Sequence, residues 1–207
     1  VLGGSSSLNG LLYIRGQKED YDRWADLGNT GWAYDDVLPY FRKSEDQERG
    51  ENEFHGINGP LKVSDLRLKR PIADKFVRAA IETGIPLNSD CNGAQQEGVG
   101  YFQQTTFKGL RWSTAKGFLK PARKRDNLTL ITKAHVTGLK FDDKKVVGLT
   151  YKRGNETFSV TVNKEIVLSS GAINSPQLLQ LSGIGDQELL GKLGIPVRQN
   201  LPGVGKN

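Results

Sequence analysis

The sequence of 207 residues is poor in residues that bind metals or form cross-links, with one cysteine, two histidines and no methionine. A single cysteine, Cys91, excludes an intrachain disulfide and a zinc site built from cysteines. His55 and His135 are far apart in the sequence, which argues against a histidine metal cluster, and no metal site is predicted. Because methionine is also missing from the first position, we expect the chain to be part of a longer polypeptide.

Long apolar runs are also missing, and none approaches the roughly 20 residues that cross a membrane, so no integral membrane segment is expected. No signal peptide is visible, although the start of the chain is uninformative on this point. A bacterial cytoplasmic location is expected. Lysine and arginine number 29 against 23 acidic residues, an excess that invites a nucleic-acid interpretation. However, the basic residues are scattered and dense only at Lys120–Arg125, where a solvated helix face is the better explanation. No nucleic-acid partner is predicted.

The first 126 residues carry three helix signals and one polar stretch. Apolar residues recur on one face of the second helix, at Ile72, Phe76, Val77 and Ala80. The polar stretch Glu45–Asn58 is predicted to be a surface loop. The first predicted helix starts at Asp35-Asp36, with Pro39 tolerated near its N-terminus. The second spans Pro71–Thr83 and ends before Gly84. The third spans Ser113–Arg125, with Ser113 as cap and a bend or end at Pro121.

From Asn127 onward the period of the apolar residues changes to two, which is typical of β-strands. Asp142-Asp143-Lys144 and Arg153-Gly154-Asn155 have the composition of tight turns and predict an antiparallel meander. The five predicted strands are Leu128–Ile131, Val136–Phe141, Val146–Tyr151, Thr157–Val162 and Glu165–Ser169.

The last predicted strand leads into a turn of small residues, Gly171-Ala172, and then into a helix signal. Asn174 or Ser175 can cap that helix, Pro176 suits its first position, and Gly183 suits its end. A strand, a small turn and a helix form the arrangement with which open α/β sheets bind nucleotides. An ordinary connection between a strand and a helix remains the alternative.

The opening stretch VLGGSSSLNG, residues 1–10, differs from a flexible linker because it is followed by the apolar Leu11–Ile14 and not by more polar residues. We expect Leu11–Ile14 to be buried. Small residues beside a buried run predict a backbone that lies close to a neighbour, either another chain segment or a ligand.

Two stretches, GGSSSLNGLLYIRG at 3–16 and GAINSPQLLQLSGIG at 171–185, resemble the two signature segments of the glucose–methanol–choline (GMC) oxidoreductases. These are FAD enzymes that oxidise alcohols. Segments such as GWAYDDVLPYFRKSED, FHGINGPLKVSD and RWSTAKGFLKPARKRDNLTL follow in family order, so the resemblance covers nearly the whole chain. It is strongest to bacterial choline-dehydrogenase-like members.

The resemblance implies an α/β fold: a partial FAD-binding Rossmann-like domain with an antiparallel β-meander and part of a substrate-side region. It divides the chain into a flavin lid with an FAD-contacting loop (1–42), an intermediate and substrate-side segment (43–126), and part of the FAD-binding domain (127–207).

The resemblance also implies that residues at matching positions contact the flavin, although each of these residues could have a purely structural role instead. Asn9 could simply order a turn, and Val136 could be a core residue of its strand. Leu8 stands where some members carry a histidine that bonds to FAD, so the cofactor is expected to be held non-covalently. The predicted cofactor-binding residues are Gly4, Ser5, Asn9, Gly10 and Leu12 in the opening loop, Val136 through its backbone at the adenine, and Gly171 and Ala172 near the adenosine half.

Two family features are missing from the sequence. The Gly-x-Gly-x-x-Gly loop that receives the pyrophosphate does not occur. Neither His55 nor His135 falls where the family places its catalytic histidine, and Tyr101–Gln103, which match a strand facing the substrate cavity, receive no catalytic role. We therefore expect an internal fragment and name no catalytic residue.

For the whole protein, the resemblance implies that a small-molecule alcohol loses a hydride to flavin N5, with oxygen or a quinone as electron acceptor. Two alternatives stay open. One is a flavoprotein of the same fold with lyase or photochemical activity, and the other is a non-catalytic fragment that keeps the scaffold.

Overall fold

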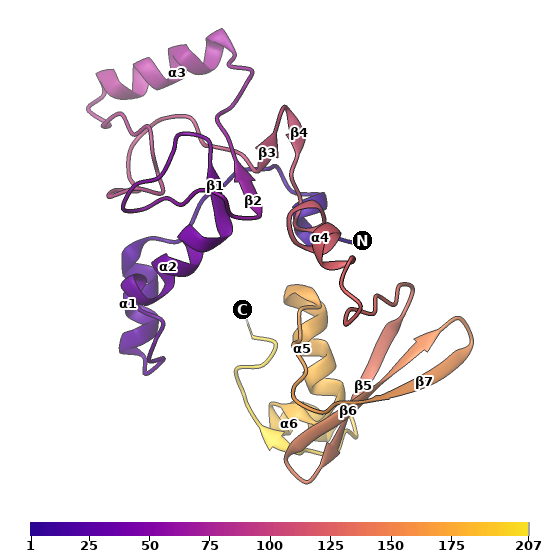
Figure 1. The fold of residues 1–207 in the computed structure, drawn as a ribbon. Helices are drawn as coiled ribbons and strands as arrows, with labels where there is room; N and C mark the ends of the chain where they lie inside the picture. Colours follow the sequence, from indigo (N-terminus) through magenta and orange to yellow (C-terminus); the bar gives the residue numbers. More distant parts are fainter. Residues whose placement is uncertain (207) are drawn as a thin grey trace. The chain divides into compact units, whose positions relative to one another are not determined.

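The computed structural model describes residues 1–206, and the chain divides into unit 1, Val1–Leu128, and unit 2, Thr129–Asn207. Both units mix helices with short strands (Figure 1). The predicted α/β class is confirmed, although the described residues form several small sheets and not one large parallel sheet. No helix of the described residues is long and apolar enough to span a membrane.

Unit 1 is organised around a short parallel pair of strands, β1 and β2, in which Glu45 is paired with Leu61 and Gln47 with Val63. A second pair, β3 and β4, is antiparallel. In chain order, the elements of unit 1 are η1 (Gly4–Ser7), α1 (Lys18–Asp26), α2 (Tyr34–Ser44), β1 (Glu45–Gln47), β2 (Leu61–Val63), α3 (Pro71–Glu82), β3 (Thr106–Phe107), β4 (Leu110–Arg111), η2 (Ala115–Leu119) and α4 (Lys120–Ala122).

The first predicted helix is confirmed as α2, with one correction at its start. Ala33 and not an aspartate is the N-cap, and Asp36 in the first turn accepts a hydrogen bond from the Ala33 N–H at 3.1 Å. Pro39 therefore lies inside the helix. The second is confirmed as α3, which ends before Gly84 at φ +94°.

The apolar face of α3 forms as the spacing predicts, but it stays open to solvent in the described chain. Ile72 is 72% exposed and Phe76 is 70% exposed. The third predicted helix forms over a shorter span: Thr114 is its first helical residue, a π-helical turn, η2, follows, and α4 ends at Ala122 directly after Pro121. The Ser113 carbonyl oxygen accepts hydrogen bonds from the N–H groups of Lys116 and Gly117, both at 2.9 Å, so Ser113 stands at the N-cap position as predicted. The end at Pro121 agrees with the prediction, because proline cannot donate the next helical hydrogen bond.

Two burial predictions for unit 1 are wrong. Leu12 and Ile14 are about half exposed, whereas the charged Arg15 that follows them is buried. The stretch Glu45–Asn58 is not simply a surface loop, because it begins with β1 and includes the buried Glu45 and His55. The reason is the same in both places: the interior of unit 1 is built largely from polar side chains that satisfy one another, which a hydrophobic pattern does not reveal.

Unit 2 contains the predicted antiparallel meander as a three-stranded sheet in the order β5-β6-β7, formed by His135–Asp142, Lys145–Arg153 and Glu156–Thr161. Two-residue turns join its strands at the two predicted places, with Asp143 and Gly154 at positive φ. Helix α5 (Gly171–Leu181) packs against β5 (Figure 1), and the Ser182 hydroxyl after it accepts a hydrogen bond from the Leu139 N–H at 3.1 Å. The remaining elements of unit 2 are β8 (Ile184–Gly185), α6 (Gln187–Lys192) and β9 (Gln199–Asn200).

Two of the five predicted strands do not form in the described chain. Leu128–Ile131 and Glu165–Ser169 have no strand beside them to share backbone hydrogen bonds, and both are irregular. The start of α5 is also corrected. The helix begins at Gly171 with Ser170 as N-cap, so Pro176 lies inside it, although Gly183 follows its end as predicted, at φ +87°.

Candidate functional site

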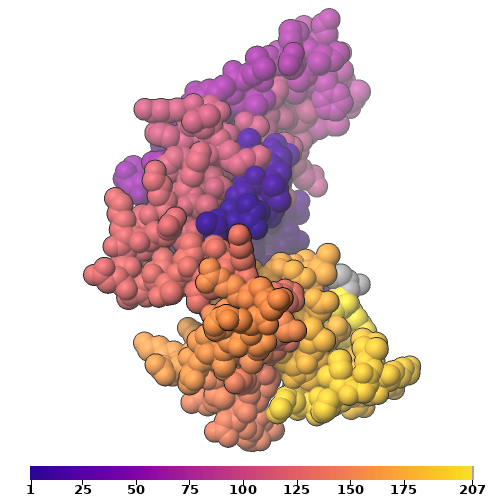
Figure 2. Space-filling view, turned by 90° about the vertical axis from the view of Figure 1, so that its right-hand side faces the viewer, coloured from indigo at the N-terminus to yellow at the C-terminus, as the bar shows by residue number. Residues whose placement is uncertain are grey.

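The opening loop, residues 3–12, is anchored to β4 and to the segment that follows it. The Arg111 guanidinium donates hydrogen bonds to the carbonyl oxygens of Ser6 and Asn9 at 3.0 and 2.8 Å. The Ser6 hydroxyl accepts a hydrogen bond from the Thr114 N–H at 2.9 Å. Figure 2 shows these first residues, in indigo, lying against the later part of unit 1. The loop is therefore a built part of unit 1 and not a linker, as the sequence predicts.

Asn9 is placed so that its two side-chain atoms can have different roles. Its Oδ1 accepts hydrogen bonds from the Leu11 N–H at 3.2 Å and from Arg111 at 2.8 Å. These contacts give the turn-ordering alternative a structural basis, and they help to hold Leu11 at φ +71°. Its Nδ2 group donates no hydrogen bond within the described chain and remains available to a ligand.

The other predicted cofactor-binding residues of this loop leave backbone groups accessible to a ligand. No atom lies within 4 Å of the point where a Cβ would stand on Gly4 or Gly10. Within residues 1–206, the N–H groups of Gly10 and Leu12 donate to no protein acceptor, although their neighbours at 11 and 13 are paired. Ser5 is exposed beside them in η1. An exposed row of free N–H donors and small residues fits the ring and phosphate oxygens of a flavin nucleotide.

The remaining three candidates belong to unit 2. Val136 is half-buried on β5, paired with Tyr151, and β5 is an edge strand with one side of its backbone free of other strands. Gly171 and Ala172 are exposed in the first turn of α5, with Gly171 at φ +91° and open space where its Cβ would be. The first N–H groups of a helix have no partner within the helix and suit an anionic ligand.

A buried polar cluster, centred on Glu45, is the feature of unit 1 that the sequence interpretation missed. The Glu45 carboxylate is fully buried and accepts a hydrogen bond from Arg15 Nη2 at 2.7 Å. Arg15 also donates to the Phe54 carbonyl oxygen at 2.8 Å. Gln47 donates to Glu45 at 3.1 Å and to Gln103 at 2.8 Å. The alternation of Glu45 and Gln47 on a short strand was the available signal, but it indicates an exposed edge as readily as a polar interior.

His55 lies inside this cluster between two carboxylates. Its Nδ1 is 3.0 Å from both Glu45 oxygens, and its Nε2 is 3.0 Å from Asp90 Oδ2. Burial alone lowers the pKa of His55, but the hydrogen bonds and charges of Asp90 and Glu45 outweigh it and raise the pKa to about 9. The hydrogen bond from His55 is the main reason that the pKa of Asp90 is lowered. His55 is thus a charged structural group and not a free base, whereas His135 is exposed on β5.

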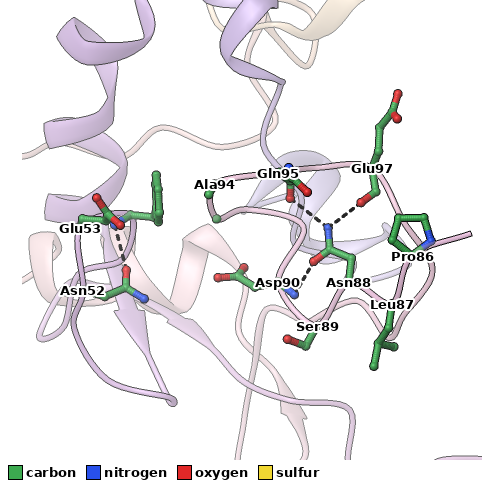
Figure 3. A pocket seen from close by; sticks show the side chains of 12 residues that line it. Asn52, Glu53, Pro86, Leu87, Asn88, Ser89, Asp90, Ala94, Gln95 and Glu97 are labelled. Carbon is green, nitrogen blue, oxygen red and sulfur yellow. Dashed lines mark hydrogen bonds between the residues drawn. The ribbon is translucent and has the colours of Figure 1, made fainter.

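An open cleft of about 540 Å³ lies beside this cluster, between the loop at 52–54 and the loop at 86–97 (Figure 3). Glu53, Asp90 and Glu97 line it. Burial raises the pKa of the nearby Cys91 thiol, so that side chain is not an activated nucleophile. Among the described residues, no group of three His, Cys, Asp or Glu side chains could hold a metal ion.

The Asn88 side chain shapes the loop that forms one wall of this cleft. It donates to the Gln95 and Glu97 carbonyl oxygens at 2.9 and 3.1 Å and accepts from the Asp90 N–H at 2.8 Å, as the dashed lines of Figure 3 show. Gly98 and Gly100 pass so close to the backbone of residues 86–88 that a Cβ on either would collide with it. The wall therefore has a defined backbone path, although it has no regular secondary structure.

Comparison with known proteins finds the same family along the whole chain. Residues 1–207 match the family described as GMC oxidoreductase. The human protein named choline dehydrogenase, mitochondrial, is 46% identical over 207 residues, which are all of this chain and 35% of that protein. The oxygen-dependent choline dehydrogenase of Pseudomonas putida is 47% identical over 211 aligned positions, covering all of this chain and 37% of that protein.

Solved structures agree with these matches. An FAD-dependent oxidoreductase from Chaetomium thermophilum has a TM-score of 0.94 and 34% identity, covering all of this chain and 38% of that one. Pyridoxine 4-oxidase from Mesorbium loti has a TM-score of 0.90 and 32% identity, covering 96% of this chain and 39% of that one. The chain therefore spans little more than a third of the length of these relatives.

Proposed function

Because the chain belongs to the GMC oxidoreductase family, we propose that it forms part of an FAD-dependent oxidoreductase that oxidises the CH–OH group of a small alcohol. The observation that carries the proposal is the opening loop. It is fixed by Arg111 and Thr114, yet the N–H groups of Gly10 and Leu12 and the Nδ2 group of Asn9 remain free for a ligand. Those free donors lie at positions that the family resemblance assigns to the flavin.

The chain's own residues hold and orient the cofactor in this proposal. In unit 1, Asn9, Gly10 and Leu12 donate hydrogen bonds to it, and Gly4 and Ser5 allow its close approach. In unit 2, the backbone of Val136 meets the adenine, and the turn at Gly171-Ala172 serves the adenosine half. When bound, FAD supplies the hydride acceptor of the reaction. The binding is non-covalent, because Leu8 carries no nucleophilic atom.

No residue of this chain is assigned to proton removal from the alcohol. His55 is occupied by Glu45 and Asp90, and His135 is an exposed strand residue. We divide the chain into a flavin lid with its contacting loop at 1–42, an intermediate and substrate-side segment at 43–126, and part of the FAD-binding domain at 127–207. We place the protein in the bacterial cytoplasm, with oxygen or a quinone accepting the electrons.

Flavin spectroscopy on the full-length protein tests the proposal. The purified protein should show visible flavin absorbance, and anaerobic addition of an alcohol substrate should bleach it. Choline is the first alcohol to try, because two of the relatives described above are named choline dehydrogenases. Re-oxidation by air or by an added quinone then identifies the acceptor.

The same experiment separates the alternatives. A protein that retains flavin but is not bleached by any of a panel of primary alcohols favours lyase or photochemical activity. A colourless protein that takes up no added FAD favours a scaffold without a catalytic role, and either result overturns the proposal.

A further inference from the structure

His55 joins two loops that are far apart in the sequence. The loop at 52–55 contributes the imidazole, and the loop at 86–97 contributes Asp90, whose Oδ2 lies 3.0 Å from His55 Nε2. These two loops are the facing walls of the cleft in Figure 3. The contact between His55 and Asp90 therefore connects the two walls.

The hydrogen-bond geometry requires a protonated ring. Ionised carboxylates only accept hydrogen bonds, and both ring nitrogens of His55 face carboxylate oxygens at 3.0 Å. Only an imidazolium has an N–H on both nitrogens. Gln47 Nε2 is also 3.2 Å from Nδ1, but its two N–H groups are used by Glu45 and Gln103.

Each carboxylate also has a partner other than His55. Glu45 on β1 is held by the buried Arg15 at 2.7 Å. Asp90 accepts a second hydrogen bond, from the Asn92 N–H at 3.1 Å, and Arg49 nearby also favours its charged form. If His55 loses a proton, one of its ring nitrogens no longer carries an N–H, and its lone pair faces a carboxylate oxygen without a hydrogen bond. The more exposed partner, Asp90, is the one that can move away.

The other ties of the loop do not depend on pH. Asn92 accepts a hydrogen bond from the Arg15 N–H at 2.7 Å and donates to the Tyr13 carbonyl oxygen at 3.0 Å. Gln96 donates to the Arg15 carbonyl oxygen at 2.6 Å. Arg49 also donates a hydrogen bond to the Ser89 carbonyl oxygen at 2.6 Å. None of these contacts involves His55, so loss of the His55 charge loosens the loop at Asp90 without detaching it from residues 13–15.

We propose that the His55–Asp90 bridge is a pH-dependent clasp that holds the two walls of the cleft together and opens when His55 loses its proton. This clasp operates whether or not the chain binds a flavin, because it lies wholly within unit 1. Since the pKa of His55 is raised from 6.5 to about 9, its stabilising contribution is complete below pH 6.5 and disappears as the pH rises through 9. The two walls are thus joined in neutral solution, and their connection loosens in alkali.

Cys91, next to Asp90 and half-buried, is a built-in reporter of the loop. The experiment measures the alkylation rate of Cys91 by iodoacetamide in the full-length protein, with peptide mass spectrometry to identify the residue. The rate is measured from about pH 6 to about pH 10 and is expressed as the ratio of His55→Gln to wild type. Taking the ratio removes the ordinary rise of thiolate with pH.

We expect the variant to react roughly tenfold faster in neutral solution, with the ratio falling to about one at the alkaline end. An increase in the alkylation rate distinguishes opening of the loop from a charge effect, because removal of a nearby positive charge by itself slows alkylation of a thiol. Glu53→Gln is the matched control: it removes a carboxylate from the same cleft without touching His55, and its ratio should stay near one throughout. A His55→Gln ratio near one at every pH, or one that is raised but constant, overturns the proposal.

If His55→Gln does not fold, as judged by circular dichroism, Asp90→Asn replaces it. This variant keeps the buried pair of Glu45 with Arg15 and an acceptor oxygen for Asn92, but it loses the charge that His55 binds. The readout is then the amide hydrogen exchange of residues 88–99 at neutral pH. Faster exchange there than in wild type supports the clasp, and unchanged exchange overturns it.

Discussion

Asn9 divides two functions between the two ends of one amide. Its oxygen holds the loop through Leu11 and Arg111, and its nitrogen is free for a ligand. Asn9→Asp keeps the acceptor oxygen and removes the donor, whereas Asn9→Ala removes both. If the nitrogen binds flavin, full-length Asn9→Asp should lose flavin or slow its reduction, while the melting temperature of its apoprotein stays nearly unchanged.

The Asn9→Ala variant serves as the comparison. It should lose flavin as well and also lower the stability of the apoprotein by about 1 kcal/mol, the usual net value of a hydrogen bond. Flavin content and thermal melts of both variants supply the measurement. Normal flavin content and reduction in Asn9→Asp would show that Asn9 only orders the turn.

Val136 tests whether a backbone group or a side chain meets the cofactor. Because the side chain is half-buried on an edge strand, Val136→Ala should cost about 1 kcal/mol of stability and leave flavin content nearly normal. Val136→Pro removes the backbone N–H and should strip the flavin. Flavin is measured in full-length variants whose circular dichroism matches that of wild type, and equal losses in both would implicate the side chain instead.

At the scale of the element, helix α5 starts at a position with a backbone conformation that favours glycine. Gly171 has φ +91° with open space where a Cβ would be, so Gly171→Ala meets no steric neighbour and suffers only backbone strain. We expect a loss of about 1–2 kcal/mol in the free energy of unfolding.

Gly191 inside α6 is the matched control for this glycine. It also has open space around its Cβ position but lies within the last turn of α6 and not at a positive φ, so Gly191→Ala should stabilise by about 0.5 kcal/mol. Chemical denaturation measures both variants. A Gly171→Ala variant as stable as wild type would show that the start of α5 relaxes freely.

The elements that the sequence predicts correctly are those whose signals are local. Helices α2 and α3 have acidic or proline starts and a glycine or polar end, and the β5–β7 meander has turn residues at both bends. Leu128–Ile131 and Glu165–Ser169 have strand composition, but a strand also needs a neighbour, which composition does not supply.

The predictions about burial fail for a similar reason. Glu45 is buried because Arg15, Gln47 and His55 satisfy it, and Arg15 is 30 residues away in the sequence. No hydrophobic period reports such a network. The family resemblance succeeds where periodicity does not, because the order of its segments marks the opening loop as a cofactor candidate before any contact is known, and the match over residues 1–207 confirms the family.

At the scale of the whole molecule, the isolated 207-residue chain should bind FAD weakly or not at all. The sequence contains no Gly-x-Gly-x-x-Gly loop for the pyrophosphate, and charge-assisted hydrogen bonds of that kind are worth roughly 1.5–3 kcal/mol each. Titration of FAD into the purified chain, followed by flavin fluorescence, checks this expectation. Sub-micromolar affinity would mean that the opening loop and unit 2 suffice for binding.

The full-length protein should release its flavin when it unfolds, because nothing in the opening loop can bond to it covalently. Leu8 is 76% exposed, and its hydrocarbon side chain has no nucleophilic atom. The nearby Ser5, Ser6 and Ser7 have unactivated hydroxyls, two of which are already engaged with protein atoms. His55 is enclosed by Glu45 and Asp90 and has no free nitrogen. Acid precipitation of the holoenzyme should therefore leave the yellow colour in the supernatant, and Leu8→His tests whether the position can acquire a link. Colour that stays with the wild-type pellet after washing would show that another residue forms the bond.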